Sequence, residues 1–265
     1  MARYAKSLIW LALVAASLKL AQTAVDYCDK KICADHQPNI GCNNDRKLSS
    51  KCPAGSKIVE VTDELKKLIL DTHNKYRSTL ATGGVPWLPK ASAMPTLTWD
   101  DDLQDTAQMN ANQCVKAHDP CHNTDKYLNS GQNINKVSTT EKIDVKEWVP
   151  KLISSFWDER HDVNSNMVSA LYDPGKSVMV YHFAVLGNDK VNKVGCGISM
   201  WPSGGGYNTM YIVCNYSFND FLGLPIYNSG EPCSACKKGC NAKYAGLCNE
   251  DEPVPQLINY PAPSA

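Results

Sequence analysis

The sequence has no excess of charge of one sign and no long apolar run beyond its first two dozen residues. It holds 27 Lys and Arg residues against 27 Asp and Glu residues. Surfaces that bind nucleic acid or anionic lipid need an excess of basic residues, so this balance argues against both. A membrane span needs about 20 consecutive apolar residues, and no stretch after residue 24 supplies them. We expect no nucleic-acid partner and no membrane span.

Motifs of common hydrolases are also missing. The chain contains neither the G-x-S-x-G turn of serine hydrolases nor the H-E-x-x-H helix of zinc proteases. Hydrolysis requires an activated nucleophile, or a metal-activated water beside an oriented substrate. We therefore predict that the protein is not an enzyme. A weak hydrolase that depends on a divalent metal ion remains an alternative.

The N-terminus has the pattern of an export signal. Arg3 and Lys6 precede an apolar run from Leu8 to Leu18, and small residues surround Ala24. This run is too short to cross ~30 Å of hydrocarbon but suits the core of a secretory signal. We predict that residues 1–24 are a cleaved signal peptide and that the mature chain is secreted and extracellular.

Twelve cysteines follow the predicted cleavage point. An even number of cysteines in an exported chain indicates a disulfide framework. Zinc is the alternative, because Cys233-x-x-Cys236 has the spacing of a ligand pair, but no second Cys/His pair of suitable spacing accompanies it. The cysteine positions by themselves leave the pairing open.

Capping residues and apolar periodicity predict three helices. The first follows Thr62 as N-cap, and the second follows Asp100, with Trp99 placed as a hydrophobic staple. The third covers residues 147–162, with Pro150 in its first turn.

The second half of the chain changes to β-type patterns. Residues 193–201 and 207–218 are predicted strands around a Gly-rich turn, and Cys196 and Cys214 could bridge them. Helices followed by strands indicate an α+β fold. The predicted organisation is a signal peptide (1–24), a cysteine-rich loop segment (25–60), a main domain (61–222), a cysteine-rich extension (223–250) and a disordered tail (251–265).

Nine short motifs follow one another in the order typical of a known family. They are His73–Arg77, Ala111–Cys114, His118–Asp119, Cys121–Thr124, Gly131–Ile134, Trp157–Glu159, His182–Phe183, Val194–Gly197 and Val213–Tyr216. Together they resemble the CAP superfamily of cysteine-rich secretory, antigen 5 and pathogenesis-related proteins. The N-terminal cysteines, beginning at Tyr27-Cys28, are similar to those of insect antigen 5. The resemblance runs from about residue 26 to 250.

The resemblance implies a fold and a disulfide pattern. The fold is a three-layer α-β-α sandwich with stapled N-terminal loops and a short cysteine-rich tail. The implied bridges are Cys28–Cys42, Cys33–Cys121, Cys52–Cys114, Cys196–Cys214, Cys233–Cys240 and Cys236–Cys248.

The resemblance also implies a central cleft with two histidines and two acidic positions. The matching residues are His118, Gln132, Glu159 and His182. Two imidazoles and a carboxylate can ligate Zn²⁺ or another divalent ion, with water completing the set. Gln132 replaces one usual carboxylate, which removes a charge and a strong oxygen ligand. No cofactor is required in this interpretation, and a hydrogen-bonded core cluster is the alternative to a metal site.

The predicted function is non-enzymatic binding of a small hydrophobic molecule, because the resemblance extends to carriers of fatty acids, eicosanoids or sterols. The residues 184–187, Ala-Val-Leu-Gly, make the cleft less polar than is usual in the family. The ligand would lie between the apolar faces of the first and third helices. Those faces comprise Leu65, Leu68, Ile69, Tyr76, Val149, Ile153, Phe156 and Trp157. The faces could instead pack on the sheet, and a secreted effector or allergen that acts on another protein is the alternative function.

Overall fold

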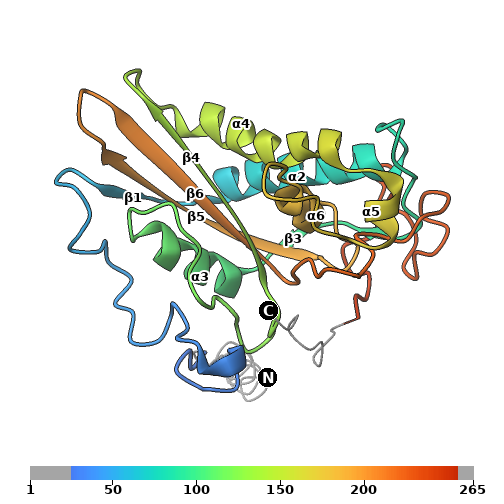
Figure 1. Ribbon diagram of the computed structural model, residues 1–265, viewed down its shortest axis with the longest axis horizontal. Helices are drawn as coiled ribbons and strands as arrows, with labels where there is room; N and C mark the ends of the chain where they lie inside the picture. The colour runs from blue at the N-terminus through green and yellow to red at the C-terminus, as the bar shows by residue number, and fades with distance from the viewer. Residues whose placement is uncertain (1–24, 256–265) are drawn as a thin grey trace, which may run out of the picture.

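The computed structural model describes residues 25–255, so the predicted signal peptide and residues 256–265 of the predicted tail lie outside the described part. Figure 1 shows a central sheet with helices on both faces. In chain order the elements are η1 (Ala34–His36), β1 (Lys57–Val59), α2 (Asp63–Ala81), β2 (Met94–Pro95), β3 (Thr98–Trp99), α3 (Asp101–Ala111), β4 (Gly131–Thr139), α4 (Val145–Asp158), η2 (Glu159–Asp162), α5 (Ser165–Ser169), α6 (Tyr181–Leu186), β5 (Lys193–Pro202), β6 (Asn208–Tyr216) and β7 (Leu247–Cys248).

The main sheet has five strands in the order β1-β5-β6-β4, with β3 also paired to β5. β5 and β6 form the predicted antiparallel hairpin, and β4 pairs antiparallel with β6 along its whole length. α3 packs on one face, and α2, α4 and α6 cover the other (Figure 1). The protein therefore has the α+β, three-layer sandwich that the resemblance implies.

Two glycines of β5 let α3 approach the sheet closely. A Cβ atom on Gly195 would lie 2.1 Å from the backbone nitrogen of Gln104, and one on Gly197 would lie 2.3 Å from the Cα of Gln108. Only glycine fits at such distances. The Gly-x-Gly spacing in β5 thus fixes how the single helix of this layer packs.

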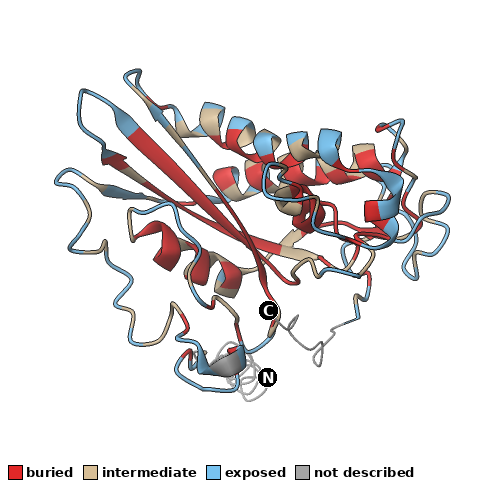
Figure 2. Ribbon diagram, in the orientation of Figure 1, coloured by how far each residue is buried: buried red, intermediate tan, exposed pale blue. Residues whose placement is uncertain are grey.

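Buried residues fill both interfaces of the sandwich (Figure 2). The larger cluster joins the sheet to α2, α4 and α6, and the smaller one joins it to α3. Cys196 and Cys214 lie opposite each other in the register of β5 and β6, on the side of the larger cluster. Within residues 25–255 no helix has the length and hydropathy needed to cross a membrane.

Helix starts follow the predicted caps in two cases out of three. The Thr62 hydroxyl accepts from the backbone N–H of Leu65, and the Asp100 carboxylate caps α3. The third helix begins at Val145, earlier than predicted, because Asp144 caps it. Its α-helical part ends at Asp158, and the 3₁₀ turn η2 continues to Asp162.

Two local expectations are therefore wrong. Pro150 lies inside α4 and not in its first turn, because the helix begins at Val145, two residues before the predicted start. Trp99 makes no apolar staple across the cap, because the facing helix position is Gln104. Its indole N–H instead donates to the Gln104 Oε1 at 2.9 Å.

All twelve cysteines are paired, and the pairs are those that the resemblance implies. The cysteine-rich extension docks on the main domain, where β7 pairs with β2. The predicted disordered tail is ordered at its start. Glu252 is buried, and its carboxylate accepts from the backbone N–H groups of Lys237 and Lys238 at 2.7 and 2.8 Å.

Candidate functional site

A cavity of about 480 Å³ opens where β4, α6 and the segment after β6 meet. This volume lies within the range of small-molecule sites. Its lining mixes imidazoles and amides with apolar side chains. The lining residues are Lys116, His118, His122, Ser130, Gln132, Asn133, Ile134, Met179, Tyr181, His182, Val185, Asn219 and Asp220.

Gln132 orients the His118 ring by a hydrogen bond to its Nδ1. The His118 Nδ1 lies 2.7 Å from the Gln132 Oε1, while the Gln132 amide N–H₂ donates to Asp119 and Asn215. Because the Gln132 oxygen can only accept, His118 carries its proton on Nδ1 and keeps a lone pair on Nε2. Desolvation of the covered side of this otherwise exposed ring lowers the pKa of His118.

Glu159 holds the His182 ring in the same way. One carboxylate oxygen lies 2.5 Å from the His182 Nδ1, and the other accepts the backbone N–H groups of His182 and Phe183 at the start of α6. The ring of Phe156 stacks on the imidazole at 5.1 Å. With Nδ1 engaged, Nε2 is the ring nitrogen left for a ligand.

The expected ligand set is therefore only partly assembled. His118 and His182 line one cavity, but Glu159 does not line it, and its oxygens are bound by a ring and two backbone amides. In the described part of the chain, no three His, Cys, Asp or Glu side chains are placed to share a metal ion. Gln132 and Glu159 position the two imidazoles, and two ring nitrogens remain as metal donors.

Sequence reasoning missed a second histidine network beside the cavity. The His122 Nδ1 lies 2.8 Å from the Asp119 carboxylate, and its Nε2 lies 3.1 Å from the Ser130 carbonyl oxygen. Both partners are acceptors, so both bonds form only with the doubly protonated ring. Burial alone would raise the pKa of Asp119, but hydrogen bonds from His122, Gln132 and Asn110 lower it. The three-residue spacing of Asp119 and His122 was the available signal.

The predicted ligand-binding faces of the first and third helices lie in the main core. Six of these side chains are buried, and Leu68 and Tyr76 are partly buried against the same cluster. α2 packs against α4, and the rings of Tyr76 and Trp157 stack with centroids 5.0 Å apart. None of the eight residues lines the cavity described above. Apolar periodicity marks burial and does not distinguish a ligand from a neighbouring helix.

One residue of the apolar segment 184–187, which makes the cleft less polar than is usual in the family, lines the cavity. Val185 lines it, whereas Ala184 is fully buried. Asn215-Tyr216-Ser217 matches the N-glycosylation pattern, but Asn215 lies in β6, where it is buried and its side-chain amide donates to Thr106 at 2.9 Å. An oligosaccharyltransferase could not reach this side chain in the folded protein.

Comparison with known proteins matches this fold and site to one family. The model of the cysteine-rich secretory protein family, CAP, matches residues 70–216. Venom allergen-1 of Aedes albopictus is 33% identical over 91% of this chain and 94% of the relative. Antigen 5 like allergen Cul n 1 of Culicoides nubeculosus is 33% identical over 66% of this chain and 83% of the relative.

Solved structures give the same result. BmVAL-1 superposes with a TM-score of 0.61 and 30% identity, over 75% of this chain and 98% of that protein. A structure of NaASP2 with Zn²⁺ superposes with a TM-score of 0.59 and 27% identity, over 74% of this chain and 99% of that protein. Sequence motifs, disulfide pattern, layer order and relatives agree: the chain belongs to the cysteine-rich secretory protein (CAP) family, as a venom allergen or antigen 5-like member.

Proposed function

We propose that the protein is a secreted, non-enzymatic binding protein that holds a small amphipathic molecule in the cavity beside His118 and His182. The observation that carries this proposal is the mixed lining of a preformed cavity. Ile134, Met179 and Val185 offer apolar surface, and the two imidazoles offer polar atoms. Burial of an apolar ligand body contributes ~25 cal/mol per Å², and the polar atoms fix its orientation.

The arrangement of donors and acceptors supports binding over catalysis. The Ser130 hydroxyl donates to the Asn123 Oδ1 at 2.7 Å, and His122 contacts the Ser130 backbone carbonyl instead of this hydroxyl. Ser130 is therefore not paired with a base. All cysteines are consumed by disulfides. The packing of α2 against α4 also favours the cavity over the interhelical space as the site of a fatty acid, eicosanoid or sterol.

A ligand panel tests the proposal. At least one fatty acid, eicosanoid, sterol or amphipathic amine should bind below ~100 μM, corresponding to more than ~5 kcal/mol. Met179→Asp should weaken that binding roughly tenfold by placing a charge on the apolar wall. Met179 is 52% exposed, so the variant should fold. Calorimetry measures both effects.

The matched control is Ile58→Asp, because Ile58 is 43% exposed and does not line the cavity. Its ligand affinity should equal that of the unmodified protein. If no member of the panel binds below ~100 μM, the binding proposal fails, and an effector that acts on another protein takes its place.

A divalent ion is a second candidate ligand, because the imidazoles of His118 and His182 line one cavity. Two imidazole nitrogens suit Zn²⁺, whose remaining positions water or a bound molecule would fill. A related structure is described with Zn²⁺. The ion would act as a Lewis acid when bound, while Gln132 and Glu159 fix the two rings.

The double variant His118→Ala/His182→Ala should therefore abolish Zn²⁺ binding measured by calorimetry. His161→Ala is the control, since that ring is exposed and stacks on Trp87 away from the cavity lining. Unchanged Zn²⁺ affinity in the double variant would place the ion elsewhere. No binding by the unmodified protein would mean that the two histidines serve only the hydrogen-bonded network.

A further inference from the structure

One buried carboxylate oxygen in the cavity wall has no partner. Among buried side-chain nitrogen and oxygen atoms of residues 25–255, only the Asp220 Oδ2 makes no hydrogen bond. Asp220 follows β6 between Phe218 and Phe221, whose rings pack edge to face at 5.4 Å. It lines the cavity together with His182 and Tyr181. Such orphaned acceptors are rare and call for an explanation.

The surroundings of Asp220 are ill suited to a lone carboxylate. Burial raises its pKa to about 7, and the nearby charge of Glu159 adds to the rise. Its own backbone N–H and the charge of His182 act in the opposite direction without restoring the ordinary value. A positively charged donor would stabilise the ionised carboxylate and remove the unsatisfied acceptor.

The imidazole of His118 offers a second acceptor in the same cavity. The His118 Nδ1 lies 2.7 Å from the Gln132 oxygen, which can only accept, so the Nε2 of the neutral ring keeps a lone pair. Together with the carboxylate of Asp220 this makes two acceptor side chains in the lining of one cavity. A primary ammonium group has three donors and a positive charge. A carboxylate head would instead face Asp220 and be repelled.

Apolar groups are placed to receive the rest of such a ligand. The thioether of Met179, the ring of Tyr181 and the side chain of Val185 belong to the same lining. Aromatic rings attract cations over their faces, and aliphatic side chains pack well against rings. Lys116, the one Lys or Arg side chain of the lining, is solvent-exposed, so water screens its repulsion.

We propose that the molecule bound in this cavity is an amphipathic primary amine whose ammonium group pairs with Asp220 and whose apolar body packs on Met179, Tyr181 and Val185. This inference rests on the function proposed above and specifies the chemistry of the ligand's head group. Reorientation of the Asp220 side chain toward the cavity brings its oxygen to the ammonium.

Three probes with the same aromatic body test the head group. They are 2-phenylethylamine, the neutral 2-phenylethanol and the anionic 3-phenylpropionate, each titrated into the full mature protein by calorimetry. We expect the amine to bind at least ~10-fold more tightly than the alcohol, and the acid to bind most weakly. This comparison uses the unmodified protein, so it does not depend on the folding of a variant.

The variant Asp220→Asn keeps the shape of the side chain and removes its charge. It should erase the preference for the amine, so that the amine and the alcohol bind with affinities within about twofold of each other. Asp125→Asn is the control, because Asp125 is exposed and does not line the cavity; it should keep the full preference.

The outcomes separate the two proposals. Equal affinity for amine and alcohol, or an amine preference that survives in Asp220→Asn, overturns the assignment of the ammonium partner and leaves the binding function standing. If neither these probes nor the wider ligand panel binds, both proposals fail together.

Discussion

Replacing Arg77 by methionine is expected to lower the free energy of unfolding by about 4 kcal/mol. Arg77 is fully buried on α2, and its guanidinium makes five hydrogen bonds to four backbone carbonyl oxygens. The accepting carbonyls belong to Pro95, Leu186, Asn188 and Val191. Methionine fills much of the space but donates nothing, so these carbonyls would lose the hydrogen bonds of the guanidinium inside the protein.

The charge of Arg77 reduces this loss without cancelling it. Burial lowers the pKa of the guanidinium to about 9, although the charge of Asp189 acts in the opposite direction. Removing the cation therefore recovers some desolvation cost. Lysine at this position should restore only part of the stability, since its single ammonium cannot reach four carbonyls spread over separate segments.

Urea unfolding with intact disulfides, followed by tryptophan fluorescence, measures the effect. Arg46→Met is the matched control. The Arg46 side chain is 57% exposed, and its pair with Asp105 at 2.8 Å should contribute about 1 kcal/mol or less. An equal, small loss in both variants would show that water replaces the donors of Arg77 inside the protein.

Local signals predicted two of the three helix starts and the hairpin, because capping and turn chemistry involve neighbouring residues. Thr62 and Asp100 cap α2 and α3 as expected. β4, by contrast, was not predicted, since its sequence Gly131–Thr139 is largely polar and depends on pairing with β6. Its first four residues are buried by the layers around them. A strand that forms through long-range pairing of this kind shows no alternation of apolar and polar residues in its own sequence.

The candidate site, too, was predictable only where the signal lies in the local sequence. Family resemblance located His118 and His182, but side-chain direction decides that Gln132 and Glu159 lie behind the imidazoles. Asp220 carried no signal, because an acidic residue after a strand is usually solvated, and its burial arises from distant segments. His73, in the first of the family motifs, belongs to the core. It is fully buried, contacts the Ile69 carbonyl and the Tyr216 hydroxyl, and burial lowers its pKa to about 4.

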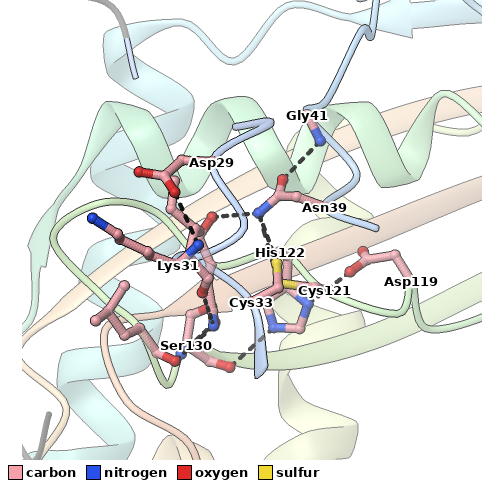
Figure 3. The surroundings of a disulfide bond; sticks show 12 residues. Asp29, Lys31, Cys33, Asn39, Gly41, Asp119, Cys121, His122 and Ser130 are labelled. Carbon is pink, nitrogen blue, oxygen red and sulfur yellow. Dashed lines mark hydrogen bonds and ion pairs between the residues drawn. A yellow bond between two sulfur atoms is a disulfide. The ribbon is translucent and has the colours of Figure 1, made fainter. Parts of the chain in front are cut away.

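The bridge between Cys33 and Cys121 joins the N-terminal loops to the wall of the cavity. Figure 3 shows it next to His122, whose ring lies between Asp119 and Ser130. The Asn39 side-chain amide donates to the carbonyl oxygen of Asn123 at 2.8 Å and contacts both sulfur atoms. The bridge thus holds the segment that carries His118 and His122, two of the histidines that line the cavity.

Replacing Cys33 and Cys121 together by serine should lower the free energy of unfolding by about 3.5 kcal/mol, against about 2 kcal/mol for Cys233 and Cys240. The first bridge spans 88 residues, and the intact Cys52–Cys114 bridge inside it shortens the loop that it closes to about 26 residues. The second bridge spans 7, so the first restricts the unfolded chain more. The serine pair at 33 and 121 should also weaken ligand binding in the cavity, whereas the other pair should not, because it lies in the C-terminal extension. Urea unfolding and calorimetry of both double variants measure these differences.

Similar losses of stability in the two variants would mean that restriction of the unfolded chain is not what the long bridge contributes. Unchanged ligand affinity at 33 and 121 would mean that the hydrogen bonds of Asn39 and His122 hold this wall without the disulfide.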